Sequence, residues 1–75
     1  MVNKIVADSL EKELFNGFDI AKISREAFRL YQDPELALTP EIDSVLLELM
    51  AMTEGPEFEM SEAECRRLIV DIRSM

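Results

Sequence analysis

The chain has 75 residues, enough for one hydrophobic core and too few for two, so a single helical domain spanning residues 1–75 is expected. It carries 16 acidic and 8 basic residues, a formal net charge of −8 that disfavours binding to nucleic acid. It has no histidine and one cysteine, Cys65, which excludes an intrachain disulfide and the common histidine-based metal sites.

The sequence predicts a cytoplasmic protein. No apolar run approaches the roughly 20 residues that a bilayer requires, and the first residues lack the apolar core of a signal peptide. A lone cysteine also fits a reducing compartment better than a secreted one. No membrane contact is therefore expected.

Two helices are predicted in the first half of the chain. Residues 2–15 carry apolar side chains at spacings of three and four, and Gly17 follows as a helix stop. Asp19 is the expected N-cap of the second helix, which Asp33 and Pro34 end. The first apolar stripe is Val2, Ile5, Val6, Leu10 and Leu14. The second is Ile20, Ile23, Ala27, Leu30 and Tyr31.

The third predicted helix begins with a capping hydroxyl at Thr39 followed by Pro40 at the first helical position. Gly55 and Pro56 are expected to end it. Its apolar stripe is Ile42, Val45, Leu46, Leu49 and Met50. Further apolar residues lie outside that stripe: Leu47, Ala51 and Met52. A helix that is apolar around most of its circumference is typical of a central position or of contact with another chain.

The fourth helix has the clearest start. Ser61 and Glu64 have the spacing of a capping box, and Met60 can pack against Cys65 across the cap. The apolar stripe continues through Leu68, Ile69 and Ile72. Together these patterns predict an all-α fold, a compact bundle or orthogonal array of four short helices.

No pattern in the chain indicates catalysis. Cys65 lies on an apolar stripe and has no histidine to activate it, so it is interpreted as a core residue. Glu59 and Glu62 share a helical spacing, but the residues around Gly55 do not match a calcium-binding loop. We therefore expect a protein that is not an enzyme and uses neither metal nor cofactor.

Charge is unevenly distributed along the chain. Residues 33–64 contain ten acidic residues and no lysine or arginine. An acidic surface speeds association with a basic partner, although carboxylates near helix N-termini also serve stability and solubility alone. The candidate partner-binding face is Glu48, Glu54, Glu57 and Glu59. The leading hypothesis is a small acidic adaptor, inhibitor or regulatory module that acts through contacts with a basic protein.

Two further sets of residues suggest other contacts. Phe28, Leu47 and Val70 lie off the main apolar stripes, which favours an exposed apolar patch and a homodimer. Lys22, Arg25 and Arg29 share one face of the second helix, after a tight turn. This arrangement supports an alternative hypothesis, a helix-turn-helix regulator that contacts phosphate. An ordinary solvated face, with an ion pair between Lys22 and Glu26, explains the same pattern.

Overall fold

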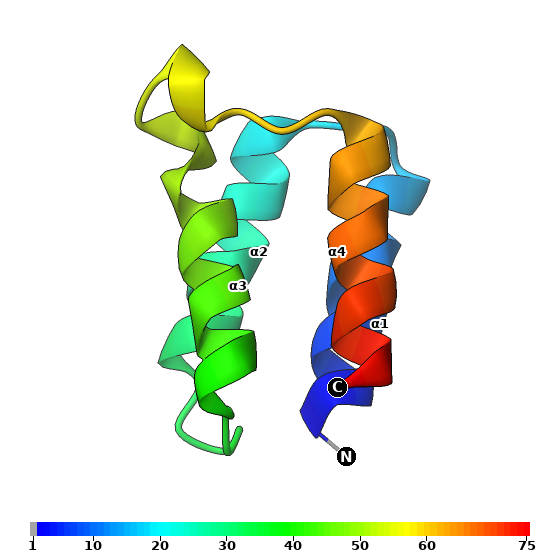
Figure 1. The fold of residues 1–75 in the computed structure, drawn as a ribbon, viewed down its shortest axis with the longest axis vertical. Coiled ribbons are helices and arrows are strands. Elements are labelled where there is room, and N and C mark those ends of the chain that lie inside the picture. The colour runs from blue at the N-terminus through cyan, green and yellow to red at the C-terminus, as the bar shows by residue number, and fades with distance from the viewer. Residues whose placement is uncertain (1) are drawn as a thin grey trace.

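The computed structural model describes residues 2–75, and within them it contains four α-helices and no strand. The helices are α1 (Val2–Phe15), α2 (Ile20–Gln32), α3 (Pro40–Met50) and α4 (Glu62–Ser74). Two short 3-10 helices, η1 (Ala51–Thr53) and η2 (Pro56–Phe58), lie between α3 and α4. The helices run alternately up and down, so the start of α1 and the end of α4 lie at the same end (Figure 1). The predicted all-α class is confirmed, in the form of a bundle.

The helix boundaries follow from the capping residues that the sequence contains. The Asp19 carboxylate accepts hydrogen bonds from the backbone N–H groups of Ala21 and Lys22, at 3.0 and 3.3 Å. The Thr39 hydroxyl accepts from the Ile42 N–H at 3.2 Å. Gly17 has a φ of 101°, the left-handed conformation that closes α1 without a side-chain clash.

The capping box of α4 forms as predicted. The Ser61 hydroxyl accepts from the Glu64 N–H at 3.1 Å, and the Ser61 N–H donates to the Glu64 carboxylate at 2.9 Å. The bond from the Ser61 N–H, and after it the interaction of the carboxylate with the Ser61 side chain, lower the pKa of the Glu64 carboxyl from its ordinary value. The cap therefore contributes stability above that ordinary pKa and loses it as the pH falls.

Replacing Ser61 by alanine should lower the free energy of unfolding by about 1 kcal/mol, because the Glu64 amide loses its hydroxyl partner. Urea melts at neutral pH measure the change. Ser44→Ala is the matched control, since Ser44 is exposed within α3 and caps no helix. Equal melts for the two variants would contradict the capping role of Ser61.

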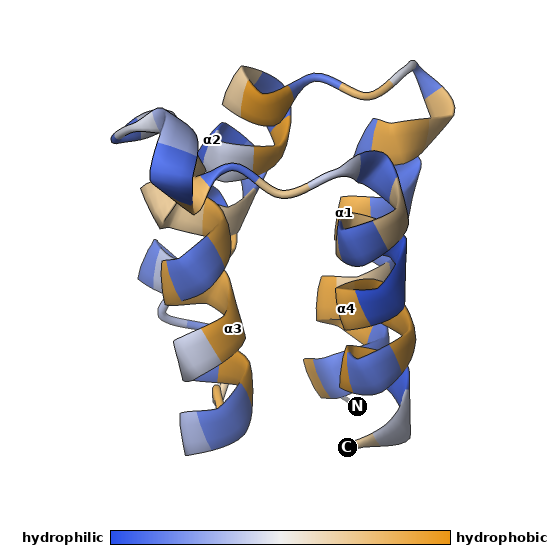
Figure 2. Cartoon of the chain, turned by 45° about the horizontal axis from the view of Figure 1, so that its top comes forward, coloured by the Kyte–Doolittle hydropathy of each residue, from blue (hydrophilic) through white to orange (hydrophobic). Residues whose placement is uncertain are grey.

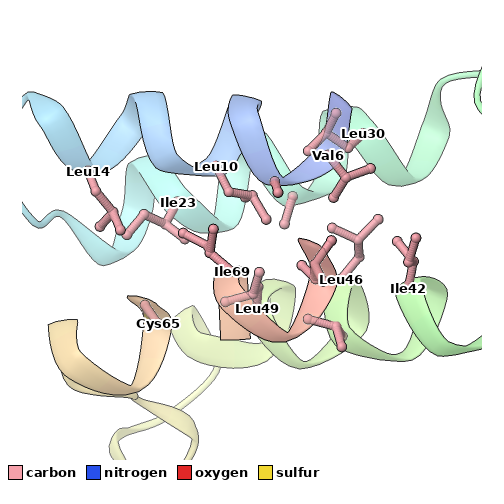
Figure 3. Close-up of a cluster of buried hydrophobic side chains, with 14 of the residues drawn as sticks. Val6, Leu10, Leu14, Ile23, Leu30, Ile42, Leu46, Leu49, Cys65 and Ile69 are labelled. Atoms are coloured by element: carbon pink, nitrogen blue, oxygen red, sulfur yellow. The ribbon is translucent and has the colours of Figure 1, made fainter. Parts of the chain in front are cut away.

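One hydrophobic core joins the four helices. Figure 3 shows Leu46 and Ile69 pointing from one side of this core toward Val6 and Leu10 on the other. The helix pairs that pack most extensively are α2 with α3 and α1 with α4, followed by α1 with α2. The buried apolar residues are Val6, Ala7, Leu10, Leu14, Ile23, Ala27, Leu30, Ile42, Val45, Leu46, Leu49, Met52, Cys65, Ile69 and Ile72.

Two residues assigned to the apolar stripes are exposed, so those assignments were wrong. Ile5 lies at the edge of its predicted stripe, and the packed face of α1 is shifted away from it toward the fully buried Ala7. Tyr31 lies in the last turn of α2, also at a stripe edge. There its aromatic ring and hydroxyl are partly in water, as is common for tyrosine.

The end of α3 also differs from the prediction. The α-helix ends at Met50, before the expected stop at Gly55, and continues as η1. The Ser24 hydroxyl of α2 donates to the Met50 carbonyl at 3.0 Å, which supplies that carbonyl with a partner outside its own helix. Because a 3-10 helix has three residues per turn, Met52 falls below Leu49 and is buried, contrary to its predicted place outside the stripe.

Candidate protein-binding groove

A groove lies between α3 and α4, and we call it the α3–α4 groove. It consists of two adjoining hollows of about 450 and 580 Å³ that share Glu48, Met60 and Glu64. Its apolar lining is Leu47, Ala51, Phe58, Met60, Ala63 and Leu68. Its acidic lining is Glu48, Glu57, Glu59 and Glu64. Apolar and acidic side chains therefore share one concave surface.

The groove exists because α3 and α4 are each held by a different neighbour and pack little against each other. Arg73 of α4 lies 2.7 Å from the Asp8 carboxylate and 3.2 Å from that of Glu11, both on α1. The Ser24 hydrogen bond holds the end of α3 against α2. Hydrophobic residues of the helices are turned toward the interior (Figure 2), where the buried side chains form one cluster.

η1 and α4 contact each other through Met52 and Cys65, the residues that follow Ala51 and Glu64 of the groove lining. The Cys65 thiol lies 4.0 Å from the Met52 sulfur, and both side chains are buried. From there the chain passes through η2, which places Phe58 on the groove with nearly half of its surface exposed. The connection between α3 and α4 thus forms part of the lining.

The groove carries an excess of negative charge. Within residues 2–75, the carboxylates of Glu48, Glu57 and Glu59 form no ion pair. Arg67 is the one basic residue that lines the described hollows, and its guanidinium lies 3.8 Å from Asp71 on its own helix. Since these groups are exposed, their field extends into solvent with limited local neutralisation.

Comparisons of the chain with protein families, curated proteins and solved structures give no match. Within residues 2–75, no group of three or more cysteine, aspartate and glutamate side chains is placed to hold a metal ion. None of the helices in that range is both long and apolar enough to cross a membrane.

Three of the four predicted acidic residues come together in the groove: Glu48, Glu57 and Glu59. Glu54 lies in the turn between η1 and η2, is exposed, and lines neither hollow. Glu64, which the sequence assigned to the helix cap, is an additional lining residue. Its position follows from the way α4 lies beside α3, which local sequence patterns do not describe.

The three residues proposed for self-association lie on three different helices. Phe28 of α2, Leu47 of α3 and Val70 of α4 are all exposed. Leu47 alone lines the α3–α4 groove, and α2 and α4 do not pack extensively against each other. A homodimer formed through these residues stays a prediction.

The basic residues of α2 also lie together. Lys22, Arg25 and Arg29 line an open hollow of about 380 Å³, which Glu13 and Glu26 share. Glu26 forms its ion pair with Arg29 and not, as predicted, with Lys22. Two carboxylates in this hollow weaken its attraction for phosphate.

Proposed function

We propose that the chain is a small acidic protein-binding module, an adaptor, inhibitor or regulatory protein whose partner is basic. The observation that supports this proposal is the α3–α4 groove, where exposed apolar side chains such as Leu47 and Phe58 share a concave surface with four glutamates. The proposal assigns no catalytic step to the chain.

The two kinds of lining residue have different roles in such a module. Apolar side chains that leave water on binding supply most of the affinity, with Phe58 and Leu47 offering the largest exposed surfaces of the groove. The glutamates accelerate encounter with a basic partner and disfavour acidic ones. A groove with both features selects a partner that is itself apolar and basic.

A helix-turn-helix regulator is the second candidate, favoured by the shared exposed face of Lys22, Arg25 and Arg29. Its binding to duplex DNA would weaken steeply with salt, because lysine and arginine contacts release counterions from the phosphates. We rank it second, because Glu13 and Glu26 lie in the same hollow and the net charge is −8.

Two matched double variants test the acidic groove. Partners are captured from native cells on the tagged full chain and identified by mass spectrometry, and the captured protein is then purified. With Glu57→Gln and Glu59→Gln, association should be about three- to tenfold slower in about 50 mM salt, and the difference should shrink in about 500 mM salt. Glu35→Gln with Glu54→Gln removes the same charge outside the groove and should have little effect.

The same experiments distinguish the two candidates. The triple variant Lys22→Gln, Arg25→Gln and Arg29→Gln should bind the captured protein as the original chain does. A gel shift with mixed DNA fragments in about 50 mM salt should show no complex. If both acidic double variants slowed association equally, the groove would not be the binding surface. If the original chain bound DNA and the basic triple variant did not, the helix-turn-helix hypothesis would be favoured.

A further inference from the structure

We infer that the partner's bound segment is a basic amphipathic α-helix that lies lengthwise between α3 and α4. This inference rests on the proposed function and specifies the partner's structure. The apolar face of that helix covers Met60 and Leu68, and its basic side chains lie opposite Glu48, Glu57 and Glu64.

The geometry of the walls favours a helix over an extended peptide. An extended segment binds most often by adding to a sheet edge, and residues 2–75 contain no strand. A polyproline segment requires several aromatic side chains, whereas Phe58 is the one aromatic residue that lines the described hollows. α3 and α4 run antiparallel (Figure 1), and the apolar side chains that line the hollows between them can pack against the ridges of a third helix.

The walls also set the length of the bound segment. The lining runs from Ser44 to Ala51 on one wall and from Ala63 to Leu68 on the other. At about 1.5 Å per residue, the longer of these stretches is roughly 12 Å long, so about eight residues of a bound helix lie against it. The apolar anchors of that helix then recur at positions i, i+3 or i+4, and i+7, the spacing of one helical face.

The charges of the lining specify the rest of the segment. Glu48 belongs to α3, Glu64 to α4, and Glu57 to η2, so both walls and the connection between them contribute negative charge to the lining. Lysine or arginine on both flanks of the apolar face complements this arrangement. Arg67, on the α4 wall, repels a basic residue placed next to it, so it lowers the affinity of a segment that is basic throughout.

A second copy of this chain is the competing occupant, because α2 also has an exposed basic face. That face includes Glu26, which is paired with Arg29, so part of its charge is already neutralised. Docking of α2 into the groove of another copy would also be a head-to-tail contact. Repeated contacts of this kind build an open filament unless the copies close into a ring. These features favour a different protein as the occupant.

The probe is a synthetic peptide of about 14 residues, with leucines at helical spacing and lysines on the flanks. Nitrogen-15-labelled full chain is titrated with it while helix formation is followed by circular dichroism. Amide shifts should be confined to residues 44–51 and 57–68, and the peptide should become helical. Affinity should be at least about tenfold higher than for a scrambled peptide of the same composition, which supplies the same charge without an apolar face.

The variants replace exposed residues, so we expect each of them to fold as the original chain does. Arg67→Glu should strengthen binding about three- to tenfold, and Leu47→Asp should weaken it by a similar factor. Glu35→Gln with Glu54→Gln should leave the affinity unchanged. Equal affinity for the scrambled peptide, or shifts centred on α2, would overturn the helix proposal. The helix proposal would also be overturned if the chain alone formed a dimer in sedimentation equilibrium and Leu47→Asp dissociated that dimer.

Failure of this inference can be separated from failure of the proposed function. If capture of the cellular partner depends on Glu57 and Glu59 but its bound segment gains no helix, the module stands and the helical occupant is wrong. If capture does not depend on Glu57 and Glu59, and the affinity for the peptide does not change in Leu47→Asp or Arg67→Glu, the groove itself is not the binding site.

Discussion

Replacing Leu46 by alanine is expected to lower the free energy of unfolding by about 2 to 5 kcal/mol, much of the total stability of a domain this small. Leu46 is 0% exposed and lies in the core that joins α3 to the other helices (Figure 3). Its removal takes away buried apolar surface and leaves a cavity that the packed helices fill only in part.

The neighbouring leucine supplies the control. Leu47 is 45% exposed on the same helix, and Leu47→Ala makes the same chemical change outside the core. Its cost should be below about 1 kcal/mol. Urea melts of both variants, followed by circular dichroism, measure the difference. Similar losses at the two positions would mean that the packed face of α3 is not the one described.

Most of the fold could be predicted because its signals are local. The starts of α2, α3 and α4 are set by side chains that bond to amides two or three residues away, at Asp19, Thr39 and Ser61. Gly17 ends α1 through its own backbone conformation. Each of these interactions lies within a few residues of sequence, so a pattern of residue types is sufficient to find it.

The errors occur where a distant residue decides the local structure. The Met50 carbonyl is bonded by Ser24, 26 positions earlier in the chain, and no pattern near Met50 indicates that partner. The 3-10 turn that follows brings Met52 into the core. The burial of a residue at the edge of an apolar stripe is hard to predict for a related reason. The orientation of α1 that exposes Ile5 depends on the helices that α1 packs against.

The candidate groove was predictable only in part. The charge pattern identified Glu48, Glu57 and Glu59, since a long run without a basic residue is visible in the sequence. The charge pattern could not show that Glu54 lies outside the groove or that Glu64 lines it, because both facts depend on how α4 lies beside α3. A groove is a property of two helices that are held apart, and that separation is set by their other neighbours.

The Cys65 thiol should react with iodoacetamide more than about a thousandfold more slowly in the folded chain than in urea. For a domain stable by about 5 kcal/mol, the open fraction is only about 10⁻⁴, and labelling requires that opening. Cys65 is 2% exposed, and its thiol contacts the Met52 sulfur between α4 and η1. Burial raises the pKa of this thiol, and the charges of Glu64 and Glu62 raise it further, so the reactive thiolate is also rarer.

The raised pKa fixes the direction of the pH dependence. Above the ordinary pKa of cysteine, the unfolded chain loses the thiol proton while the folded chain keeps it, so Cys65 contributes stability below that pKa and loses it as the pH rises. Mass spectrometry of timed labelling at pH 8, with and without urea, gives the protection, and alkaline urea melts give the trend. Cys65→Ala is the control for the melts and should reduce the loss of stability at high pH. Folded and unfolded chains that label within tenfold of each other would show that the contact between η1 and α4 does not stay closed.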